Sequence, residues 1–156
     1  MAVVMTTPMS EIDKIINQQL ELVDQETINV LSYLGEMCVT EARDRTQEVS
    51  WYDHTGNLRS SIGYIVTQNG RIVGMSSFAS INGGGEGSST GQTYSKNIAS
   101  KFNNGFSLII VAGMEYAALV EAMENKVVLA SAELLARKEL DGFISKLNNK
   151  LRRKIK

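Results

Sequence analysis

Hydrophobic residues recur every three or four positions over residues 10–45, which is the spacing of one face of an α-helix. Ser10 is the predicted N-cap, and acidic residues follow in the first turn, where the helix dipole favours them. An unbroken helix would extend about 54 Å, so it is expected to need a partner surface beyond its own domain. A bend or break is expected at Gly35, because glycine costs about 1 kcal/mol relative to alanine inside a helix. Residues 1–9 are interpreted as a flexible leader.

Short apolar runs separated by turn formers follow this helix. Residues 49–58 mix aromatic side chains with turn formers and predict a structured loop. Residues 60–68 and 71–75 each predict a strand, and Asn69-Gly70 stands between them. Because a type I′ turn needs a positive φ at both central positions, this dipeptide favours a hairpin.

The second half of the chain predicts a loop, further strands and two helices. Residues 82–91 are rich in glycine and serine and are expected to form a flexible loop within one domain. The apolar run at residues 106–112 predicts a buried strand. The remaining predicted elements are a short helix at 116–123, a turn at 124–126, a short edge strand at 127–129 and a final helix capped by Ser131.

These elements predict an α+β fold, with a small antiparallel sheet packed against a long N-terminal helix and a C-terminal helix. A chain of 156 residues is the size of one domain, here residues 10–156, and is able to bury a core of its own. One cysteine excludes an internal disulfide framework, and one cysteine with one histidine is too few for a His/Cys zinc site. No apolar run reaches the roughly 20 residues of a membrane span, and the N-terminus is a poor signal peptide.

Charge is unevenly distributed, although the net charge is only −1. Residues 10–48 carry nine acids and three bases, a local charge of −6. Residues 145–156 carry six bases and no acid, a local charge of +6. The acidic first helix and the basic tail are therefore expected to attract each other, either within one subunit or between subunits.

The glycine-rich segment has the composition of a phosphate-binding loop without its spacing. A P-loop needs a lysine next to its second glycine, and no lysine lies between Arg71 and Lys96. The dinucleotide-binding pattern fails as well, because Thr90 stands where its third glycine is needed. No bound cofactor is expected.

Catalytic chemistry has little support in the sequence. Asp53, His54 and either Ser60 or Ser61 have the residue types of a catalytic triad, but no nucleophile-elbow signature supports one. His54 is interpreted as a loop residue that makes a hydrogen bond. Cys38 falls on the apolar face of the first helix, where packing is the expected role. The sequence therefore does not predict an enzyme.

Two acids flank the predicted short helix. Glu115 and Glu121 are six residues apart, which places them on different helix faces and argues against a paired acid–base role. Glu115 is assigned a capping contact and Glu121 a salt bridge. The basic tail is interpreted as a solvated or intersubunit helix end, because it lacks the interleaved aromatics of single-strand binders.

Two segments carry a family resemblance. One is Thr55-Gly56-Asn57-Leu58-Arg59-Ser60-Ser61-Ile62-Gly63-Tyr64, and the other is Gly113-Met114-Glu115-Tyr116-Ala117-Ala118-Leu119-Val120-Glu121. The chain resembles the small tail-completion, or head–tail joining, proteins of tailed bacteriophages, a family of minor tail and neck proteins. That family typically shows Thr-Gly-x-Leu-Arg-x-Ser-Ile and later Tyr-Ala-x-x-Val-Glu, in the same order of helix, hairpin, strand and helix.

The resemblance implies a structural virion protein, made in the bacterial host cytoplasm and placed at the neck of the virion. Copies would form a ring, commonly six-fold in the family, between the head connector or portal-side proteins and the tail tube or tail terminator. No membrane partner is implied, and nucleic acid would be met only by non-specific contact. The alternative hypothesis is a nucleic-acid-binding accessory protein that uses the basic C-terminal helix.

The motif residues also have physical interpretations. Thr55 is expected to cap a short turn, and Gly56 permits an unusual φ or a close backbone approach. Arg59 is able to pair with a carboxylate such as Glu121, within or between subunits. Tyr116 offers an apolar anchor under the sheet. The residues assigned to the motifs or to assembly contacts are Thr55, Gly56, Asn57, Leu58, Arg59, Ser61, Tyr116, Glu121, Arg152 and Arg153.

Overall fold

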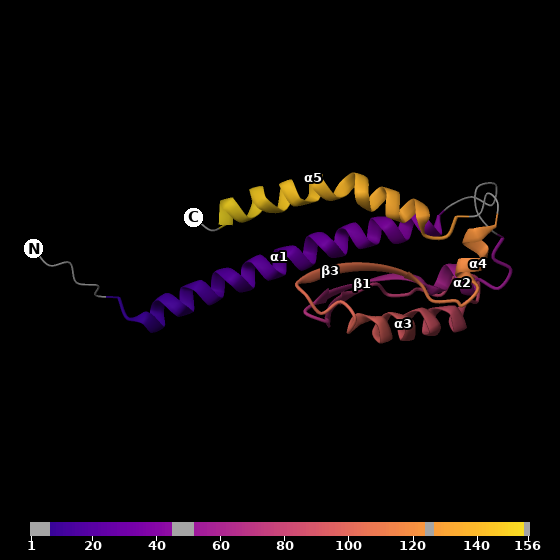
Figure 1. Ribbon diagram of the computed structural model, residues 1–156, viewed down its shortest axis with the longest axis horizontal. Coiled ribbons are helices and arrows are strands. Elements are labelled where there is room, and N and C mark those ends of the chain that lie inside the picture. The colour runs from indigo at the N-terminus through magenta and orange to yellow at the C-terminus, as the bar shows by residue number, and fades with distance from the viewer. Residues whose placement is uncertain (1–6, 45–51, 124–126, 155–156) are drawn as a thin grey trace, which may run out of the picture.

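The computed structural model describes residues 7–44, 52–123 and 127–154 and contains a three-stranded antiparallel sheet with helices on both faces (Figure 1). The predicted α+β fold, with its long first helix and its C-terminal helix, is confirmed. The elements are α1 (Met9–Arg43), α2 (Asn57–Ser61), β1 (Ile62–Gln68), β2 (Arg71–Met75), α3 (Gly85–Ala99), β3 (Phe106–Ala112), α4 (Ala117–Ala122) and α5 (Ala130–Lys154).

The sheet lies between two helical layers. α1 packs along one face and α3 covers the other, while α5 lies against α1 (Figure 1). β1 is the central strand and pairs antiparallel with β2 on one side and β3 on the other. Ile65 of β1, for example, stands opposite Met75 and Ile109. β1 is therefore buried on both faces, and its apolar side chains serve two separate packing layers.

The predicted hairpin is confirmed in detail. Asn69 and Gly70 have φ angles of 51° and 80°, the positive values that a type I′ turn requires. Two hydrogen bonds of 2.9 Å join Asn69 to Gly105, one from each backbone N–H. The turn between β1 and β2 is thereby fixed to the residue that precedes β3.

The main core lies between α1, α5 and the sheet. Cys38 is fully buried in this core, as the apolar face of the first helix predicted, and burial raises the pKa of its thiol. The side chains that fill the core are Leu34, Cys38, Val39, Ala42, Leu58, Ile62, Tyr64, Val66, Ala117, Val128, Ala132 and Phe143. Apolar contact along α1 therefore joins the sheet to α5.

α1 differs from its prediction at two positions. It is continuous through Gly35, and it begins at Met9 after Pro8 rather than at a Ser10 cap. A Cβ atom on Gly35 would lie 2.6 Å from the nearest ring carbons of Tyr64, so this glycine makes room for the tyrosine ring. Close packing against the sheet, rather than a bend, explains the glycine in the middle of the helix.

The flexible loop predicted at residues 82–91 is wrong, because its second half forms the start of α3. Gly91 is buried, and a Cβ atom there would lie 2.5 Å from the carbonyl oxygen of Ser61 and 2.8 Å from the ring of Phe78. Phe78 also packs over Gly63 of β1 and is 1% exposed. Gly91 therefore allows α3 to pack closely on Ser61 and Phe78, and a composition typical of flexible loops belongs here to a packed helix.

Smaller differences concern element boundaries. The strand predicted from residue 60 begins at Ile62, since the preceding residues form α2. No strand occurs at residues 127–129, where the chain leads directly into α5. α5 begins at Ala130, and the hydroxyl of Ser131 is buried without a hydrogen-bond partner among the described residues, so Ser131 is not its N-cap. The turn predicted at 124–126, and parts of the predicted leader and loop (1–6 and 49–51), lie outside the described residues.

Candidate functional site

The first motif segment forms α2 and the turn before it. The side-chain oxygen of Thr55 accepts the backbone N–H of Asn57 at 3.3 Å, and the carboxylate of Asp53 accepts the N–H of Arg59 at 2.8 Å. Gly56 has a φ of 72°, a conformation that favours glycine. Two polar side chains therefore satisfy free N–H groups at the start of a helix, and Asp53 has a capping role rather than a catalytic one.

α2 packs directly on the beginning of α3. The side-chain amide of Asn57 donates to the carboxylate of Glu86 at 3.0 Å, and its oxygen accepts the N–H of Gly87 at 3.2 Å. A Cβ atom on Gly56 would lie 1.9 Å from the carbonyl oxygen of Ile81, so the two backbones approach closely here. The motif is thus bound to the segment that was predicted to be a loop.

The two serines of the motif are buried, and their hydroxyls are used locally. Ser60 Oγ accepts the N–H of Ile81 at 2.8 Å, and Ser61 Oγ donates to the carbonyl of Leu58 at 2.8 Å. His54 is exposed and has its ring 4.2 Å from that of Tyr52, edge to face. Neither serine is therefore placed as a nucleophile beside His54.

The second motif segment meets the first, although the two are far apart in sequence. The N–H of Gly113 donates to the carbonyl of Ser61 at 3.1 Å. Residues of both segments line a cavity of about 360 Å³: Tyr52, Asp53, His54, Thr55, Leu58, Tyr116, Val120 and Met123. Burial, followed by the charges of Asp53 and Glu86, raises the pKa of the Tyr116 hydroxyl. Tyr116 is 39% exposed at this cavity.

Arg59 closes the C-terminal end of α1. Its guanidinium donates a short hydrogen bond to the backbone carbonyl of Arg43, the last residue of that helix. Arg43 in turn donates to the carbonyl of Ile62 at 2.5 Å. A cation at the carbonyl end of a helix is favoured by the helix dipole. These two arginines thus hold the end of α1 against α2 and β1.

Glu121 caps the start of α5. Its carboxylate accepts three backbone N–H groups, from Val128 at 3.2 Å and from Leu129 and Ala130 at 2.9 Å each. The sequence assigned a salt bridge to Glu121 and a capping contact to Glu115, so the role predicted for Glu121 is wrong, and the side chain of Glu115 is exposed. The carboxylate stabilises the otherwise unsatisfied N–H groups of the helix start and is favoured there by the dipole.

The acidic first helix and the basic tail meet within one chain. Glu26 has a side chain that is 7% exposed, and its carboxylate lies 2.5 Å from Lys150 Nζ and bonds Lys154 as well. These two lysines lower the pKa of Glu26 more than burial raises it. Arg152 and Arg153 are exposed and form no ion pair with another described residue. The charges of Lys150 and Lys154 are thus paired, whereas those of Arg152 and Arg153 are exposed.

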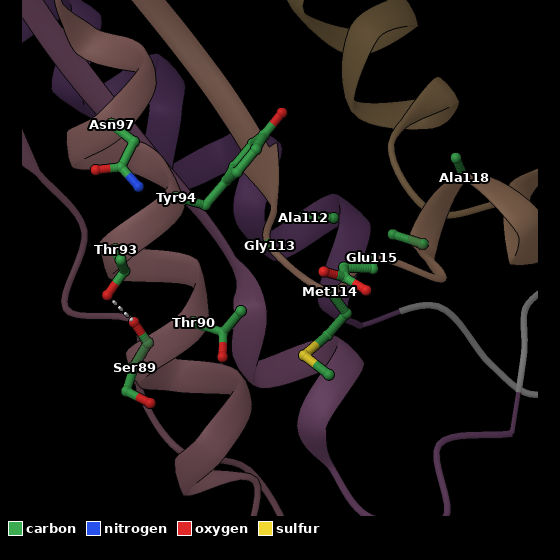
Figure 2. A pocket seen from close by; sticks show the side chains of 11 residues that line it. Ser89, Thr90, Thr93, Tyr94, Asn97, Ala112, Gly113, Met114, Glu115 and Ala118 are labelled. Atoms are coloured by element: carbon green, nitrogen blue, oxygen red, sulfur yellow. Dashed lines mark hydrogen bonds between the residues drawn. The ribbon is translucent and has the colours of Figure 1, made fainter.

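A cavity of about 570 Å³ lies beside α3 (Figure 2). Figure 2 shows Ser89, Thr90, Thr93 and Tyr94 of α3 on one side and the segment from Ala112 to Ala118 on the other. Thr93 already donates to the carbonyl of Ser89 at 2.9 Å. Among these described lining residues, Glu115 is the one carboxylate and no cation is present. The lining lacks the convergent acid, base and nucleophile of a catalytic site.

No group of three or more His, Cys, Asp or Glu side chains that suits a metal ion occurs among residues 7–44, 52–123 and 127–154. In the same ranges, none of the helices has the length and apolar character needed to cross a bilayer. The chain matched none of the protein-family models, curated proteins or solved structures with which it was compared. The likeness to head–tail joining proteins therefore depends on the two motif segments and the order of elements.

Proposed function

We propose that this protein is a structural component of a tailed-phage virion, which forms a ring at the head–tail interface. The observation that carries the proposal is the meeting of the two motif segments at one corner of the molecule, around Leu58 and Tyr116. The described polar contacts of that corner cap helices or join backbones. Such contacts suit a protein whose work is assembly rather than chemistry.

The shape of the chain also supports an assembly role. α1 has 35 residues, and its N-terminal part extends past the sheet and past the end of α5 (Figure 1). A projecting helix offers a contact surface at one end of the molecule that differs from the surface at the other. Contacts between unlike surfaces generate rings when the rotation closes.

The test is electron microscopy of lysates from a phage that carries this gene and from the same phage with the gene deleted. A neck role predicts filled heads and finished tails that lie unjoined in the deletion lysate, with joining restored by the gene in trans. Abnormally long or absent tails would move the role to tail termination or tail assembly. Intact, infectious virions would reject the structural proposal.

The alternative is a nucleic-acid-binding accessory protein, favoured by the exposed bases at the end of α5. Lys146 and Arg153 line a cavity of about 420 Å³, but the neighbouring Lys150 and Lys154 already bind Glu26. The alternative predicts DNA affinity that falls steeply with salt and is lost on reversing the charges of Arg152 and Arg153. If the variant with reversed charges at Arg152 and Arg153 and an Arg71→Glu control bind DNA with equal, weak affinity, the nucleic-acid alternative is excluded.

A further inference from the structure

One face of α1 carries a row of apolar side chains, here called the apolar seam. This seam is longer than the surfaces that cover it. In the body of the protein this seam packs into the main core. It continues toward the N-terminus at helical spacing through Leu34, Val30, Thr27, Val23, Leu20, Ile16 and Ile12. Exposure rises from 1% at Leu34 to 56% at Leu20 and is 50% at Ile16, while Ile12 is half-buried. The outer part of the seam is thus an apolar face without a cover in this chain's described residues.

Both covers end at the same level of α1. The sheet reaches as far as Asp24, whose carboxylate accepts a hydrogen bond of 2.8 Å from Gln68 at the end of β1. α5 reaches as far as Glu26, which binds Lys150 and Lys154 in the last turns of that helix. N-terminal to Asp24, α1 extends beyond both the sheet and α5 (Figure 1). We call residues 9–23 the α1 tip.

The α1 tip exposes several large apolar side chains. Its exposed apolar side chains are Met9 at 61%, Ile15 at 56%, Ile16 at 50% and Leu20 at 56%. The tip is 15 residues long by numbering, about 22 Å, and helices of this length are marginal in water without packing. An apolar stripe of this kind on an otherwise polar helix indicates a face that packs against a partner.

A matching surface lies on α5. Leu140 and Ile144 are 41% and 46% exposed, and Leu147 and Leu151 continue their row as half-buried residues. We call these four residues the α5 stripe. Residues 140–154 carry five bases and one acid. Lys150 and Lys154 already bind Glu26 of their own chain, so Lys146, Arg152 and Arg153 supply the positive charge at this surface. The α1 tip carries three acids and one base. The two surfaces are therefore complementary in charge, and both are apolar along one helical row.

We propose that the α1 tip of one copy packs on the α5 stripe of a second copy, head to tail. The inference deepens the proposed function, because it names the contact from which the ring is built. Pairing of two α1 tips would oppose acids such as Glu11 and Asp13 on both sides. A lipid surface is a poor occupant, since membrane-surface helices carry bases on their polar face.

Two double variants test the contact, with solution mass measured by light scattering during size exclusion. The tip variant is Ile16→Asp with Leu20→Asp, and the stripe variant is Leu140→Asp with Ile144→Asp. Wild type is expected to form closed oligomers, and each variant alone is expected to be monomeric. An equimolar mixture of the two variants retains one intact tip and one intact stripe, so it is expected to give a heterodimer and nothing larger.

Control variants add acidic side chains elsewhere on these two helices. Asn17→Asp with Gln18→Asp places two acids on the polar side of the α1 tip, and Leu134→Asp places one on a separate face of α5, where the leucine is 69% exposed. Both controls are expected to assemble like wild type. Monomeric wild type at high concentration, self-association of the stripe variant, or no heterodimer in the mixture would each overturn the proposal.

A milder pair of variants covers the case in which the acidic ones fail to fold. Copies with Ile16→Cys and copies with Ile144→Cys are mixed under mild oxidation, Cys38 remaining buried. A disulfide-linked heterodimer is expected, and Asn17→Cys in place of Ile16→Cys is expected to give much less. Equal cross-linking from both positions would contradict the contact.

The outcomes separate this inference from the proposed function. If deletion of the gene leaves heads and tails unjoined while the purified chain stays monomeric, the neck role stands and the contact is wrong. If the contact forms but phage without the gene remain infectious, the contact stands and the neck role is wrong.

Discussion

At the scale of single residues, several glycines matter because a side chain at their position would collide with neighbouring atoms. Gly84, Gly87 and Gly91 lie where α3 passes within close backbone distance of α2 and the sheet. Gly85, in the same helix turn, has no heavy atom within 4 Å of its Cβ position. The same residue type in one short segment thus serves close packing at some positions and leaves others open to substitution.

This contrast gives a matched pair of variants. In Gly87→Ala the new Cβ would lie 1.9 Å from the carbonyl oxygen of Asn57, so backbone must move. We expect a loss of about 2 kcal/mol or more in the free energy of unfolding, with a melting temperature lower by about 4–8 °C. Gly85→Ala is expected to be neutral or to stabilise the helix by up to about 1 kcal/mol. Equal melting temperatures for the two variants would contradict the packing argument.

Glu121 provides a second residue-scale prediction. Replacing it with alanine removes the acceptor of three N–H groups at the start of α5. We expect a loss of about 1–2 kcal/mol, measured by urea unfolding. Glu115→Ala removes an exposed carboxylate six residues earlier and serves as the control. If both variants unfold at the same urea concentration, the capping role of Glu121 is wrong.

At the scale of elements, the docking of α5 on α1 is expected to depend on pH through Glu26. Lys150 and Lys154 hold the pKa of Glu26 below its ordinary value of 4.5. A lowered folded pKa means that this stabilisation is complete above 4.5 and is lost as the pH falls through the folded value. The last turns of α5 should therefore detach in acid.

Hydrogen exchange measures this detachment. We expect the protection factors of amides 146–154 to fall between about pH 6 and about pH 3 in wild type. In Glu26→Gln they should be low at both pH values. Glu133→Gln removes an exposed ion pair with Arg137, which contributes little to stability, and should leave the wild-type profile unchanged. A wild-type profile in Glu26→Gln would show that apolar packing alone holds the end of α5.

Elements with a periodic or turn-specific pattern were the predictable ones. α1, the hairpin, β3 and α5 follow from apolar spacing, from Asn69-Gly70 and from an unbroken apolar run. α3 was missed because glycine and serine are poor helix formers, and packing on the sheet overrides that preference. The capping role of Glu121 was missed, because the N–H groups that it accepts stand at the start of α5 and not on the helix that carries the carboxylate.

At the scale of the whole molecule, the chain is a compact body with one uncovered helical extension. In dilute, monomeric protein we expect amides 12–22 to exchange almost without protection, since short unpacked helices open readily. Residues 27–43 of the same helix, packed on the sheet and on α5, should be protected. Assembly at higher concentration should protect 12–22 as well. Strong protection of this segment in the monomer would mean that the α1 tip needs no partner.

The sequence by itself determined what depends on neighbouring residues: the helical spacing of α1 and α5, the apolar run of β3, the turn at Asn69-Gly70 and the separation of acidic and basic ends. The tertiary structure decided the rest. A glycine-rich segment packs as a helix because Gly87 and Gly91 leave room for α2 and for the ring of Phe78. Among the described acids of α1, Glu26 is the one placed opposite Lys150 and Lys154 of α5. Local patterns record the preferences of a few residues, whereas burial, close approach and ion pairing depend on atoms brought together from distant parts of the chain.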